Sequence, residues 1–584
     1  MPTPHTQAPP PPKNKVIVTS ALPYSNGDLH IGHLLEYLQS DTWVRFRKML
    51  GDECYFFCAD DTHGTPIMIA AKKQGISPEE LITHQRTLHL NEFQAFNVEF
   101  THYSSTHSEH NRRLCNAFYQ KMLSHNHLFK KTIEQSYCLT CQMFLPDRLI
   151  KGTCPKCKTP DQYGDVCEAC GSTYAPEELI AAACTTCHTP PTIKKSEHLF
   201  FKLDAFSQFL KEWIPNHTSQ EVTQQLDNWF QQGLAAWNIS RDEPYFGFAI
   251  PNYPTKYFYV WVDAPIGYIS ASEEWGEQHK HTTPFSEHWK NPANEIVHFI
   301  GKDIIYFHAL FWPAMLKCAG FAPPARLFVH GFLTLNGEKM SKSKGTFILA
   351  RTYLNSHIPT DYLRYYFISK ANGSFEDVDL NLTDFKDKIN SELIGKITNL
   401  ASRSISMLHK RANSTLADFS KPGHTLYNEV TAKKDAIATA YREAKFNSVI
   451  ITVRSLAEQT NKYFDTNAPW TKPPAEIAEV TAILSDVIQI FRILVIYLAP
   501  VLPEYTKKAR HVLNEPTPPK KSSPTPPPTY HNTTQPHATY TWNDLNHPLP
   551  QGHLLNPYEH LASRITEEDL AKLLDPSTPP AATQ

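Results

Sequence analysis

Two histidines, His30 and His33, flank Ile31-Gly32 at the point where an apolar run gives way to a helical pattern. Residues 16–19 are typical of a buried strand, and the apolar residues that follow recur at steps of three or four, as on the buried face of a helix. The start of a helix offers free backbone amides and the positive end of the helix dipole, which favour a phosphate chain. Gly32 lets a flat ring or a phosphate approach the backbone closely. The segment therefore predicts a phosphate-binding site.

A second candidate segment is a lysine-serine loop at residues 339–343, bracketed by Gly337 and Gly345. The glycines give this loop freedom to move, and lysine is a compact cation on a flexible stem. Lys339 and Lys342 can therefore swing onto a triphosphate when its charge needs compensation, and withdraw afterwards. Taken alone, the loop is equally compatible with a solvated basic turn.

Eight of the twelve cysteines fall in four Cys-x-x-Cys pairs within one segment. Each pair can form a knuckle whose two thiolates share a metal ion, so eight thiolates suffice for two closed tetrahedral sites. Full thiolate shells leave no open position for water, which predicts structural rather than catalytic Zn²⁺. The pairs are Cys138/Cys141, Cys154/Cys157, Cys167/Cys170 and Cys184/Cys187.

The first two segments together resemble the signature pair of class I aminoacyl-tRNA synthetases, HIGH and KMSKS, which stand letter for letter at residues 30–33 and 339–343. Four further stretches are similar to the methionyl-tRNA synthetase family: ALPY at 21–24, ADDTHGTP at 59–66, YVWVDAPIGY at 259–268 and HFIGKD at 298–303. The resemblance runs from about residue 14 to about residue 512 and resumes near the C-terminus. It implies a ligase that activates L-methionine with ATP to methionyl-adenylate, releases pyrophosphate, and transfers the methionyl group to tRNA(Met).

The resemblance also implies roles for individual residues. Asp61 is expected to hold the ammonium group of methionine. His30 and His33 are expected to bind the ATP phosphates. Lys342, with Lys339 and a Mg²⁺ ion, is expected to steady the charge that develops in the transition state. The expected catalytic residues are His30, His33, Lys339 and Lys342, and the expected ATP-binding residues are His30, Gly32, His33 and Lys342.

The side-chain pocket is expected beside the aromatic run at residues 257–261, which reads as a strand whose alternate residues share one face. A mostly apolar pocket with a few polar tips suits a thioether, because its polarizable sulfur packs near aromatic rings. By the resemblance, the methionine site comprises Leu22, Tyr24, Asp61, Trp261, Ala264, Pro265, Tyr268, Ile304 and His308. Residues 327–334 read as one further strand that leads into the lysine loop.

From about residue 384 to residue 513 the hydrophobic pattern has the period of helices, which predicts an all-helical bundle. Asn399 and Arg403 are four residues apart and share a helix face. Without other information they would be a solvated polar patch. Together with Trp470, however, they resemble the family's anticodon-reading residues, where splayed bases stack on an indole and are hydrogen-bonded on their edges.

Strands alternating with helices from residue 15 predict an α/β fold. We expect a Rossmann-like doubly wound catalytic domain, split by a zinc-knuckle connective insertion and followed by an all-helical anticodon-binding bundle. The expected divisions are a disordered N-terminal tail (1–14), the first half of the catalytic domain (15–130), the insertion (131–198), the second half with the lysine loop (199–383), the helical domain (384–515), a Pro-rich linker (516–541) and a C-terminal segment that packs back on the body (542–584).

Composition bears on where the protein works. At a formal charge of −2, the chain lacks the overall positive charge that is typical of non-specific nucleic-acid binders. Any RNA contact must therefore use local basic patches. The proline-rich start lacks a charged region followed by an apolar core, and no stretch approaches the roughly 18 to 20 apolar residues of a membrane span. We therefore expect a cytoplasmic protein with no membrane partner. The chain ends without the extra tRNA-binding, dimer-forming domain of many relatives, which favours a monomer.

Two questions stay open from the sequence. Relatives that carry a single zinc keep the two middle cysteine pairs, which suggests a nested arrangement with one or two Zn²⁺ per chain, but the spacing does not decide which pairs share an ion. Other function classes also remain. A nucleotidyltransferase of the same fold would not need the insertion or the helical bundle, and a zinc-knuckle RNA-binding protein would not need an intact lysine loop.

Overall fold

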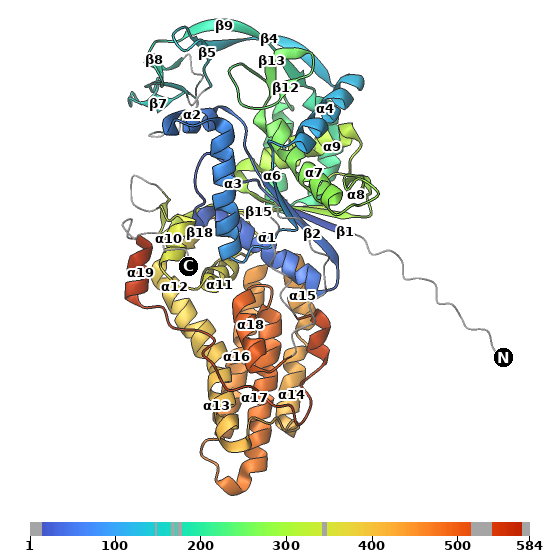
Figure 1. Ribbon diagram of the computed structural model, residues 1–584, viewed down its shortest axis with the longest axis vertical. Helices are drawn as coiled ribbons and strands as arrows, with labels where there is room; N and C mark the ends of the chain where they lie inside the picture. The colour runs from blue at the N-terminus through green and yellow to red at the C-terminus, as the bar shows by residue number, and fades with distance from the viewer. Residues whose placement is uncertain are drawn as a thin grey trace, which may run out of the picture.

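The computed structural model describes residues 15–146, 149–164, 167, 170, 172, 174, 178–340, 347–515 and 540–574. The expected N-terminal tail, residues 516–539 of the expected linker, and Lys342 lie outside these ranges. The described chain forms an α/β body, with a strand-built arm above it and a long helical bundle below (Figure 1).

A five-stranded parallel sheet lies at the centre of the body, and it confirms the predicted doubly wound class (Figure 1). Its strands, in spatial order, are β15 (Arg326–His330), β14 (Glu295–Gly301), β1 (Lys15–Ser20), β2 (Glu53–Asp60) and β3 (His102–Ser105). Strands β2 and β3 follow β1 on one side of it, and β15 lies beyond β14 on the other side. The winding direction therefore changes between β1 and β14, where Val18 pairs with Val297. Doubly wound sheets bind ligands at this point, beyond the carboxyl ends of the strands.

Helices cover both faces of this sheet. Alternate residues of β1 serve the two faces, because Val16 and Val18 belong to the core under α1 (Ile31–Met49), whereas Ile17 belongs to the core under α7 (Val260–Gln278). The helix expected after His30 is confirmed, and its apolar stripe is buried along its whole length. With both faces covered, the carboxyl edge of the sheet is left for ligands.

The aromatic run expected as a single strand is divided between two elements. Strand β13 (Tyr253–Phe258) ends before Tyr259, whose amide donates to the carbonyl of Ile239, and α7 begins at the next residue. The strand assignment was therefore wrong for Trp261. Four of the expected pocket residues lie on one face of a helix, at steps of three and four rather than two: Trp261, Ala264, Pro265 and Tyr268.

The strand expected at residues 327–334 is also two strands. The chain leaves the main sheet after β15 and forms β16 (Leu333–Leu335), which pairs in parallel with β18 (Val378–Leu380). The break falls at Gly331, where a Cβ would lie 2.1 Å from the carbonyl oxygen of Glu376. Only glycine allows so close an approach of the two backbones.

The arm is built on a long antiparallel pair, β4 (Leu128–Cys138) and β9 (Thr192–Phe201), at the top of Figure 1. All the Cys-x-x-Cys pairs lie between Cys138, the last residue of β4, and the turn before β9. Small strands hold this segment together: β5 (Met143–Phe144), β6 (Ile150–Thr153), β7 (Gln162–Tyr163) and β8 (Ile180–Cys184).

The bundle below the body is helical, as predicted. Its longer helices are α13 (Asn399–Ala412), α14 (Lys421–Thr431), α16 (Phe446–Asn467), α17 (Ile477–Leu498) and α18 (Pro503–Val512). The expectation that no stretch is apolar enough to span a membrane was wrong, because residues 474–498 meet that test by length and composition. Within the protein, however, 89% of that apolar window is buried. A helix surrounded by others in a bundle is hydrophobic all round for that reason.

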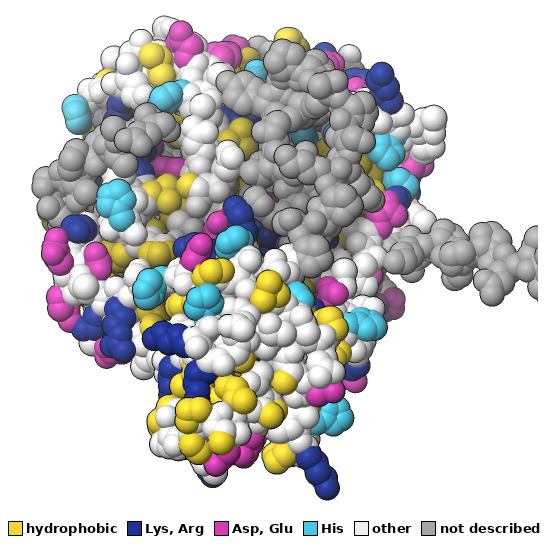
Figure 2. Space-filling model, turned by 60° about the horizontal axis from the view of Figure 1, so that its bottom comes forward, with side chains coloured by type: hydrophobic (Ala, Val, Ile, Leu, Met, Phe, Trp, Pro, Cys, Tyr) yellow, Lys and Arg dark blue, Asp and Glu magenta, His cyan; other side chains and the backbone are white. Residues whose placement is uncertain are grey.

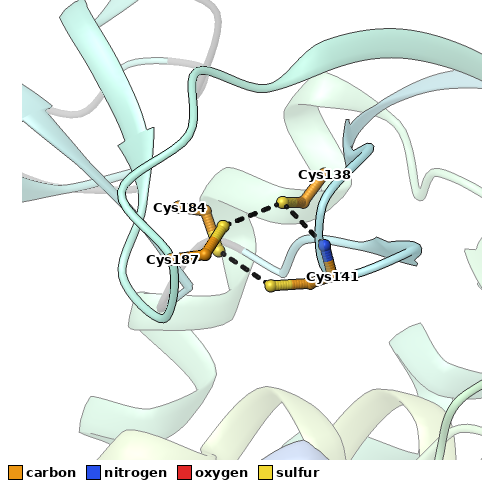
Figure 3. A group of neighbouring side chains, drawn as sticks. All are labelled: Cys138, Cys141, Cys184 and Cys187. Carbon is orange, nitrogen blue, oxygen red and sulfur yellow. Dashed lines mark hydrogen bonds between the residues drawn. The ribbon is translucent and has the colours of Figure 1, made fainter.

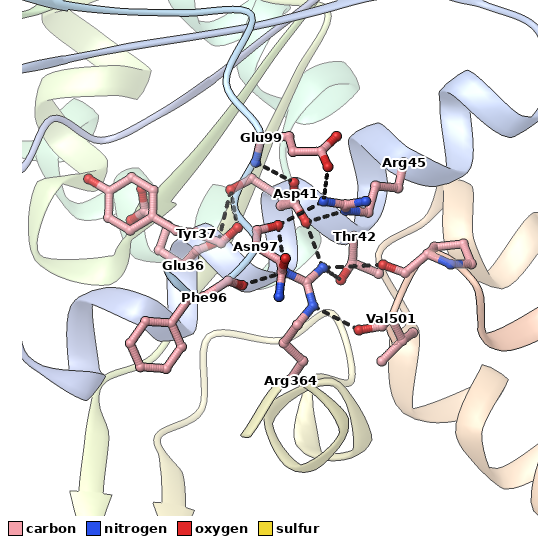
Figure 4. A network of polar contacts seen from close by, with 12 residues as sticks. Glu36, Tyr37, Asp41, Thr42, Arg45, Phe96, Asn97, Glu99, Arg364 and Val501 are labelled. Carbon is pink, nitrogen blue, oxygen red and sulfur yellow. Dashed lines mark hydrogen bonds and ion pairs between the residues drawn. The ribbon is translucent and has the colours of Figure 1, made fainter. Parts of the chain in front are cut away.

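A buried ionic network joins the body to the bundle (Figure 4). Arg364, on α11 (Thr360–Lys370), contacts Asp41 on α1 at 2.6 Å, and Arg45 contacts the same carboxylate at 2.7 Å. The Arg364 guanidinium also donates to the carbonyls of Pro500 and Val501, at the turn between α17 and α18. Asp41 and Arg364 are both inaccessible to solvent. This cluster holds α1, which packs on the sheet, against the turn that follows α17 of the bundle.

The C-terminal segment runs back from the bundle to the body. Tyr540, placed in the linker by the sequence, is buried, with the guanidinium of Arg510 4.8 Å from its ring centroid. The backbone of Ser563 and the hydroxyl of Tyr362 then exchange hydrogen bonds of 2.7 and 2.9 Å. The last helix, α19 (Glu567–Leu574), packs against α10 (Ala350–Asn355).

Candidate active site

His30 immediately precedes α1 and His33 lies in its first turn. The His30 amide donates to Nδ1 of His33 at 3.3 Å, and the two rings stack with centroids 3.6 Å apart. Burial, with His30 and His89 nearby, lowers the pKa of His33 well below its usual value. The ring is therefore neutral with its proton on Nε2, which makes Nε2 a donor for an anionic group at the start of the helix.

The two signature segments, far apart in sequence, are brought together. A Cβ on Gly32 would lie 2.6 Å from Cε of Met340, at the near end of the lysine loop. At the far end, the carbonyl of Ile348 accepts a hydrogen bond from the Ile31 amide at 3.1 Å, and the Ala350 amide donates to Leu29 at 2.9 Å. The loop is thus anchored on both sides to the turn that begins α1.

Of the two lysines expected to act, Lys339 lies on β17 (Glu338–Lys339), an exposed two-residue strand paired with β16. Its backbone register places it opposite Thr334. Lys342 belongs to the undescribed part of the loop, so its role remains a prediction.

A buried Glu36 ties the ends of the sheet strands to α1. Its carboxylate accepts from the Ala21 amide at 2.6 Å and contacts Nε2 of His330 at 3.0 Å. Burial raises the pKa of Glu36, which His330 partly offsets, and the pKa of His330 is raised by the same carboxylate despite its burial. This pair was not predicted from the sequence. Its only sequence signal is a glutamate within the first helix, six residues after His30.

Asp61 and Tyr24 face each other at the carboxyl ends of β2 and β1. The Ser25 amide donates to the carbonyl of Asp61, and the Asp61 amide donates to Pro23, each at 2.9 Å. Asp61 is 8% exposed, and its Oδ1 has no hydrogen-bond partner among the described residues. Burial, together with nearby Asp263, raises the pKa of Asp61 well above its usual value. A buried carboxylate oxygen without a partner is costly unless a cation joins it, which suits an ammonium ligand.

A second carboxylate near Asp61 was missed. Asp263, in the first turn of α7, accepts from Nδ1 of His63 at 2.5 Å, while its Oδ1 has no partner within the described part of the chain. The other ring nitrogen of His63 lies 3.0 Å from Nδ1 of His107, whose ring is exposed. Both His63 and Asp263 stand inside stretches that carry the family resemblance, at 59–66 and 259–268.

The apolar pocket residues gather between α7 and the π-helical stretch η5 (Phe307–Phe311). Trp261 stacks on Phe307 with centroids 4.0 Å apart and lies edge-on to His308. Nδ1 of His308 donates to the Ile304 carbonyl at 3.1 Å, so Nε2 accepts from the Tyr268 hydroxyl at 2.9 Å. Burial lowers the pKa of His308 to about 4, which keeps the ring neutral.

Leu22 and the helical residues complete this wall. Cδ1 of Leu22 lies 3.3 Å from the position that a Cβ on Gly267 would take, so the end of β1 packs directly on α7. Ala264 and Pro265 are buried on the same helix. The expected pocket residues therefore come from the end of β1, α7 and the turn before η5, with rings and one hydroxyl-imidazole pair among them.

The first cysteine cluster joins the two ends of the knuckle segment (Figure 3). The Sγ atoms of Cys138 and Cys187 are 3.3 Å apart, and those of Cys141 and Cys184 are 3.9 Å apart. Four thiolates at about 2.3 Å from a tetrahedral Zn²⁺ would lie about 3.8 Å from one another, so the donor set fits this ion. The Cys141 amide donates to Sγ of Cys138, the bond that shapes a knuckle.

The second cluster is formed by the two middle pairs. Sγ of Cys157 lies 3.5 Å from that of Cys167, and Sγ of Cys154 lies 3.9 Å from that of Cys170. In both clusters the four Sγ atoms lie within 4.8 Å of one another. The nested arrangement is thus the one that the fold creates, and each cluster can hold one Zn²⁺.

Two of the three residues expected to read an anticodon, Asn399 and Arg403, line a groove of about 750 Å³ between α13 and α16, and the third, Trp470, lies beside Arg403. The guanidinium of Arg403 lies 4.8 Å from the ring centroid of Trp470 and 3.0 Å from the carboxylate of Asp465. Figure 2 shows lysine and arginine side chains beside hydrophobic ones at this end of the molecule. Further lining residues that the sequence analysis missed are Lys396, Glu458, Asn461, Lys462, Asp465 and Thr466.

Comparison with known proteins agrees with this geometry. A family model described as tRNA synthetases class I (M) matches residues 16–405. A methionine–tRNA ligase of Bdellovibrio bacteriovorus is 47% identical over 564 residues, which cover 96% of this chain and 78% of the relative. A Mycobacterium tuberculosis methionyl-tRNA synthetase in complex with methionyl-adenylate shares the fold with a TM-score of 0.75 at 22% identity, covering 94% of this chain and 99% of that chain. Its free form gives a TM-score of 0.70 at 21% identity, covering 96% and 99%.

A doubly wound sheet whose HIGH segment, at the switch point, contacts Met340 of the KMSKS sequence defines a class I aminoacyl-tRNA synthetase, in agreement with the family model. Within that class, the family model and the 47% identical relative decide the matter. The chain belongs to the methionyl-tRNA synthetase family.

Proposed function

We propose that the protein activates L-methionine with ATP and transfers the methionyl group to tRNA(Met), in support of translation initiation and elongation. The observation that carries this proposal is the position of Asp61. Its carboxylate, whose Oδ1 has no partner among the described residues, follows β2 directly, pairs with Tyr24 after β1, and lies near Tyr268 of the apolar pocket of α7. A zwitterionic amino acid with an apolar side chain fits between these parts.

The chemistry needs positioning and charge compensation more than a protein nucleophile. The carboxylate oxygen of methionine attacks the α-phosphorus of ATP. The bond between the α-phosphorus and the oxygen that bridges to the β-phosphorus breaks, and pyrophosphate leaves. His30, Gly32 and His33 hold the phosphates at the start of α1. Lys339 and Lys342, together with the Mg²⁺ that accompanies ATP, offset the charge of the leaving pyrophosphate.

Asp61 holds the ammonium group of methionine, and Tyr24 and Leu22 border it from β1. Trp261, Ala264, Pro265, Tyr268, Ile304 and His308 form the side-chain pocket. The neutral His308 ring accepts a hydrogen bond from the Tyr268 hydroxyl, so neither group presents an unpaired polar atom to the thioether. Zn²⁺ in the two cysteine clusters stabilises the folded arm and takes no part in the reaction.

We also propose the domain divisions given by the sequence, with the end of the linker moved to residue 539 because Tyr540 is buried. Asn399, Arg403 and Trp470 would read the anticodon at the far end of the bundle from the sheet. We expect the protein to act in the cytoplasm as a monomer, which light scattering of the purified chain tests.

The experiment pairs two assays, charging of tRNA(Met) with labelled methionine and methionine-dependent pyrophosphate exchange. Wild-type protein is expected to perform both. Trp470→Ala should reduce charging by about tenfold, because a base–aromatic stack contributes roughly 1 to 3 kcal/mol, while leaving exchange unchanged. Ile451 is an exposed residue of α16 outside the groove, so Ile451→Ala is the matched control. It should change neither charging nor exchange. Loss of exchange in Trp470→Ala would contradict the anticodon role, and no charging by wild type would contradict the function.

Asp61→Asn tests the amino-acid site separately. Removing the carboxylate charge should raise the KM for methionine by about 10- to 100-fold, since a hydrogen bond to a charged group contributes roughly 1.5 to 3 kcal/mol. The KM for ATP should stay within about twofold. An equal rise in both constants would contradict the assignment.

A further inference from the structure

Two of the ten tryptophans are exposed, and all ten lie in the described part of the chain. Trp470 is 43% exposed and lies beside Arg403, which lines the groove of the bundle. Trp229 is 45% exposed and lies on the body, near the end of α6 (Gln220–Gln232). Nothing in the proposed activation chemistry uses Trp229.

The position of Trp229 on its helix explains why it projects. Val222 and Leu226 are buried and lie on one stripe, at a step of four, and Trp229 is the next member of that stripe, three residues further on. The helix buries Val222 and Leu226 on the body, whereas the indole at the next position of the stripe stays 45% exposed. An exposed indole does not gain the free energy that its burial would give. Its exposed surface is therefore a candidate binding surface for a partner.

Trp229 is the outer end of a column of rings that leads to the methionine pocket. Its indole stacks on Tyr306 with centroids 5.5 Å apart and planes at 12°. Tyr306 lies 4.1 Å from Phe307, which stacks on the pocket residue Trp261 at 4.0 Å and 6°. One face of the indole is covered by Tyr306, so its exposed part is the opposite face and edge. Three ring contacts in sequence thus connect Trp229 to the pocket residue Trp261.

We propose that Trp229, backed by Tyr306, is a stacking platform for an unpaired base at the 3′ end of the tRNA. This inference rests on the proposed function, because transfer requires the terminal ribose of the RNA to reach the carbonyl carbon of the methionyl group beside this column. Single-stranded bases stack on exposed aromatic side chains irrespective of sequence. Trp229 therefore acts as a positioning residue in transfer and has no part in adenylate formation.

The surroundings of the indole suit a base rather than a phosphate. Gln225 and Gln232 lie four residues before and three residues after Trp229, on the same face of α6, and both are exposed. Their neutral amides can both donate to and accept from base edges. Asp227, two residues away, points to another face of the helix.

The test uses tRNA(Met) with 2-aminopurine in place of the terminal adenine. Stacking on an indole quenches the fluorescence of this base. With saturating tRNA, wild-type protein should quench the probe, Trp229→Ala should not, and Trp229→Phe should quench it in part. Single-turnover transfer from preformed adenylate should be about tenfold slower in Trp229→Ala, while pyrophosphate exchange stays within about twofold of wild type. Trp470→Ala is the matched control, and it should keep the quenching once tRNA is saturating.

Unchanged quenching and unchanged transfer in Trp229→Ala, with exchange intact, would overturn the inference and leave the proposed function standing. A parallel loss of exchange in both Trp229→Ala and Trp229→Phe would also overturn it, because the indole would then serve the pocket. Absence of methionine-dependent exchange in the wild-type protein would instead contradict the proposed function itself.

Discussion

Gly32 and Met340 are packed so closely that a single added carbon would not fit between them: a Cβ on Gly32 would lie 2.6 Å from Cε of Met340 and 2.9 Å from Nδ1 of His30. This contact joins the first turn of α1 to the near end of the lysine loop. The two segments assigned to ATP therefore share one surface.

Gly32→Ala should slow methionine-dependent pyrophosphate exchange by about tenfold or more, because the methyl group must displace either Met340 or the His30 ring. The unfolding free energy should change by less than about 1 kcal/mol, since alanine is the better helix former and the neighbours are side chains that can move. The double variant Gly32→Ala/Met340→Ala should recover part of the lost rate. Wild-type exchange rates in Gly32→Ala would show that the contact has no role.

His308 should make folding sensitive to mild acid. Burial lowers its pKa from 6.5 to about 4, so the unfolded chain binds a proton between these values that the folded protein does not. The contribution of the neutral ring to the free energy of unfolding is fully present above pH 6.5. It is lost as the pH falls toward 4, and the total loss is about 3 kcal/mol. Urea unfolding of wild type and His308→Gln at several pH values between 4 and 7.5 measures the difference. Equal pH slopes for the two proteins would contradict the neutral buried ring.

The cysteine clusters should bind two Zn²⁺ per chain, one each. Cys154→Ser and Cys138→Ser should each reduce the zinc content measured by mass spectrometry to about one. Dialysis against a chelator should lower the melting temperature of the wild-type protein, because binding energy at such sites is folding energy. Loss of both ions from either single variant would mean that the two clusters are not independent.

The ion pair of Asp41 with Arg364 should be costly to break. Burial alone would raise the pKa of Asp41, but the guanidiniums of Arg45 and Arg364 hold it below its usual value. Asp41→Asn leaves two buried guanidiniums without their carboxylate and should reduce the unfolding free energy by about 3 to 5 kcal/mol. Glu197→Gln, which breaks the exposed pair with Lys130, should cost less than about 1 kcal/mol. Similar losses in the two variants would contradict the importance of burial.

The sequence predicted those parts of the site that leave a local pattern. The change from an apolar run to a helical period at His30 located the turn that begins α1, and the cysteine spacing located both clusters. Asp263 and His63 leave no such pattern, because a hydrogen bond between residues 200 positions apart has no period. The pairing of Arg364 with Asp41, far away in sequence, leaves no pattern for the same reason. The first pair depends on the packing of α7 near the end of β2, and the second on the packing of α11 against α1.

The error at residues 257–261 has a tertiary cause. Aromatic and β-branched residues fit a pleated surface, so the run reads as a strand. Strand β13 ends instead where the Tyr259 amide bonds to Ile239, and the helix that follows buries one face against the sheet. The pocket residues nevertheless stay together, because Trp261, Ala264 and Tyr268 have helical spacing.

The most direct test of the account is amino-acid-dependent exchange of pyrophosphate into ATP, measured without tRNA for each of the twenty amino acids. The account predicts exchange with methionine alone. Exchange with another amino acid would contradict the assignment of the pocket around Trp261 and His308. No exchange from folded, zinc-replete protein would contradict the proposed activity.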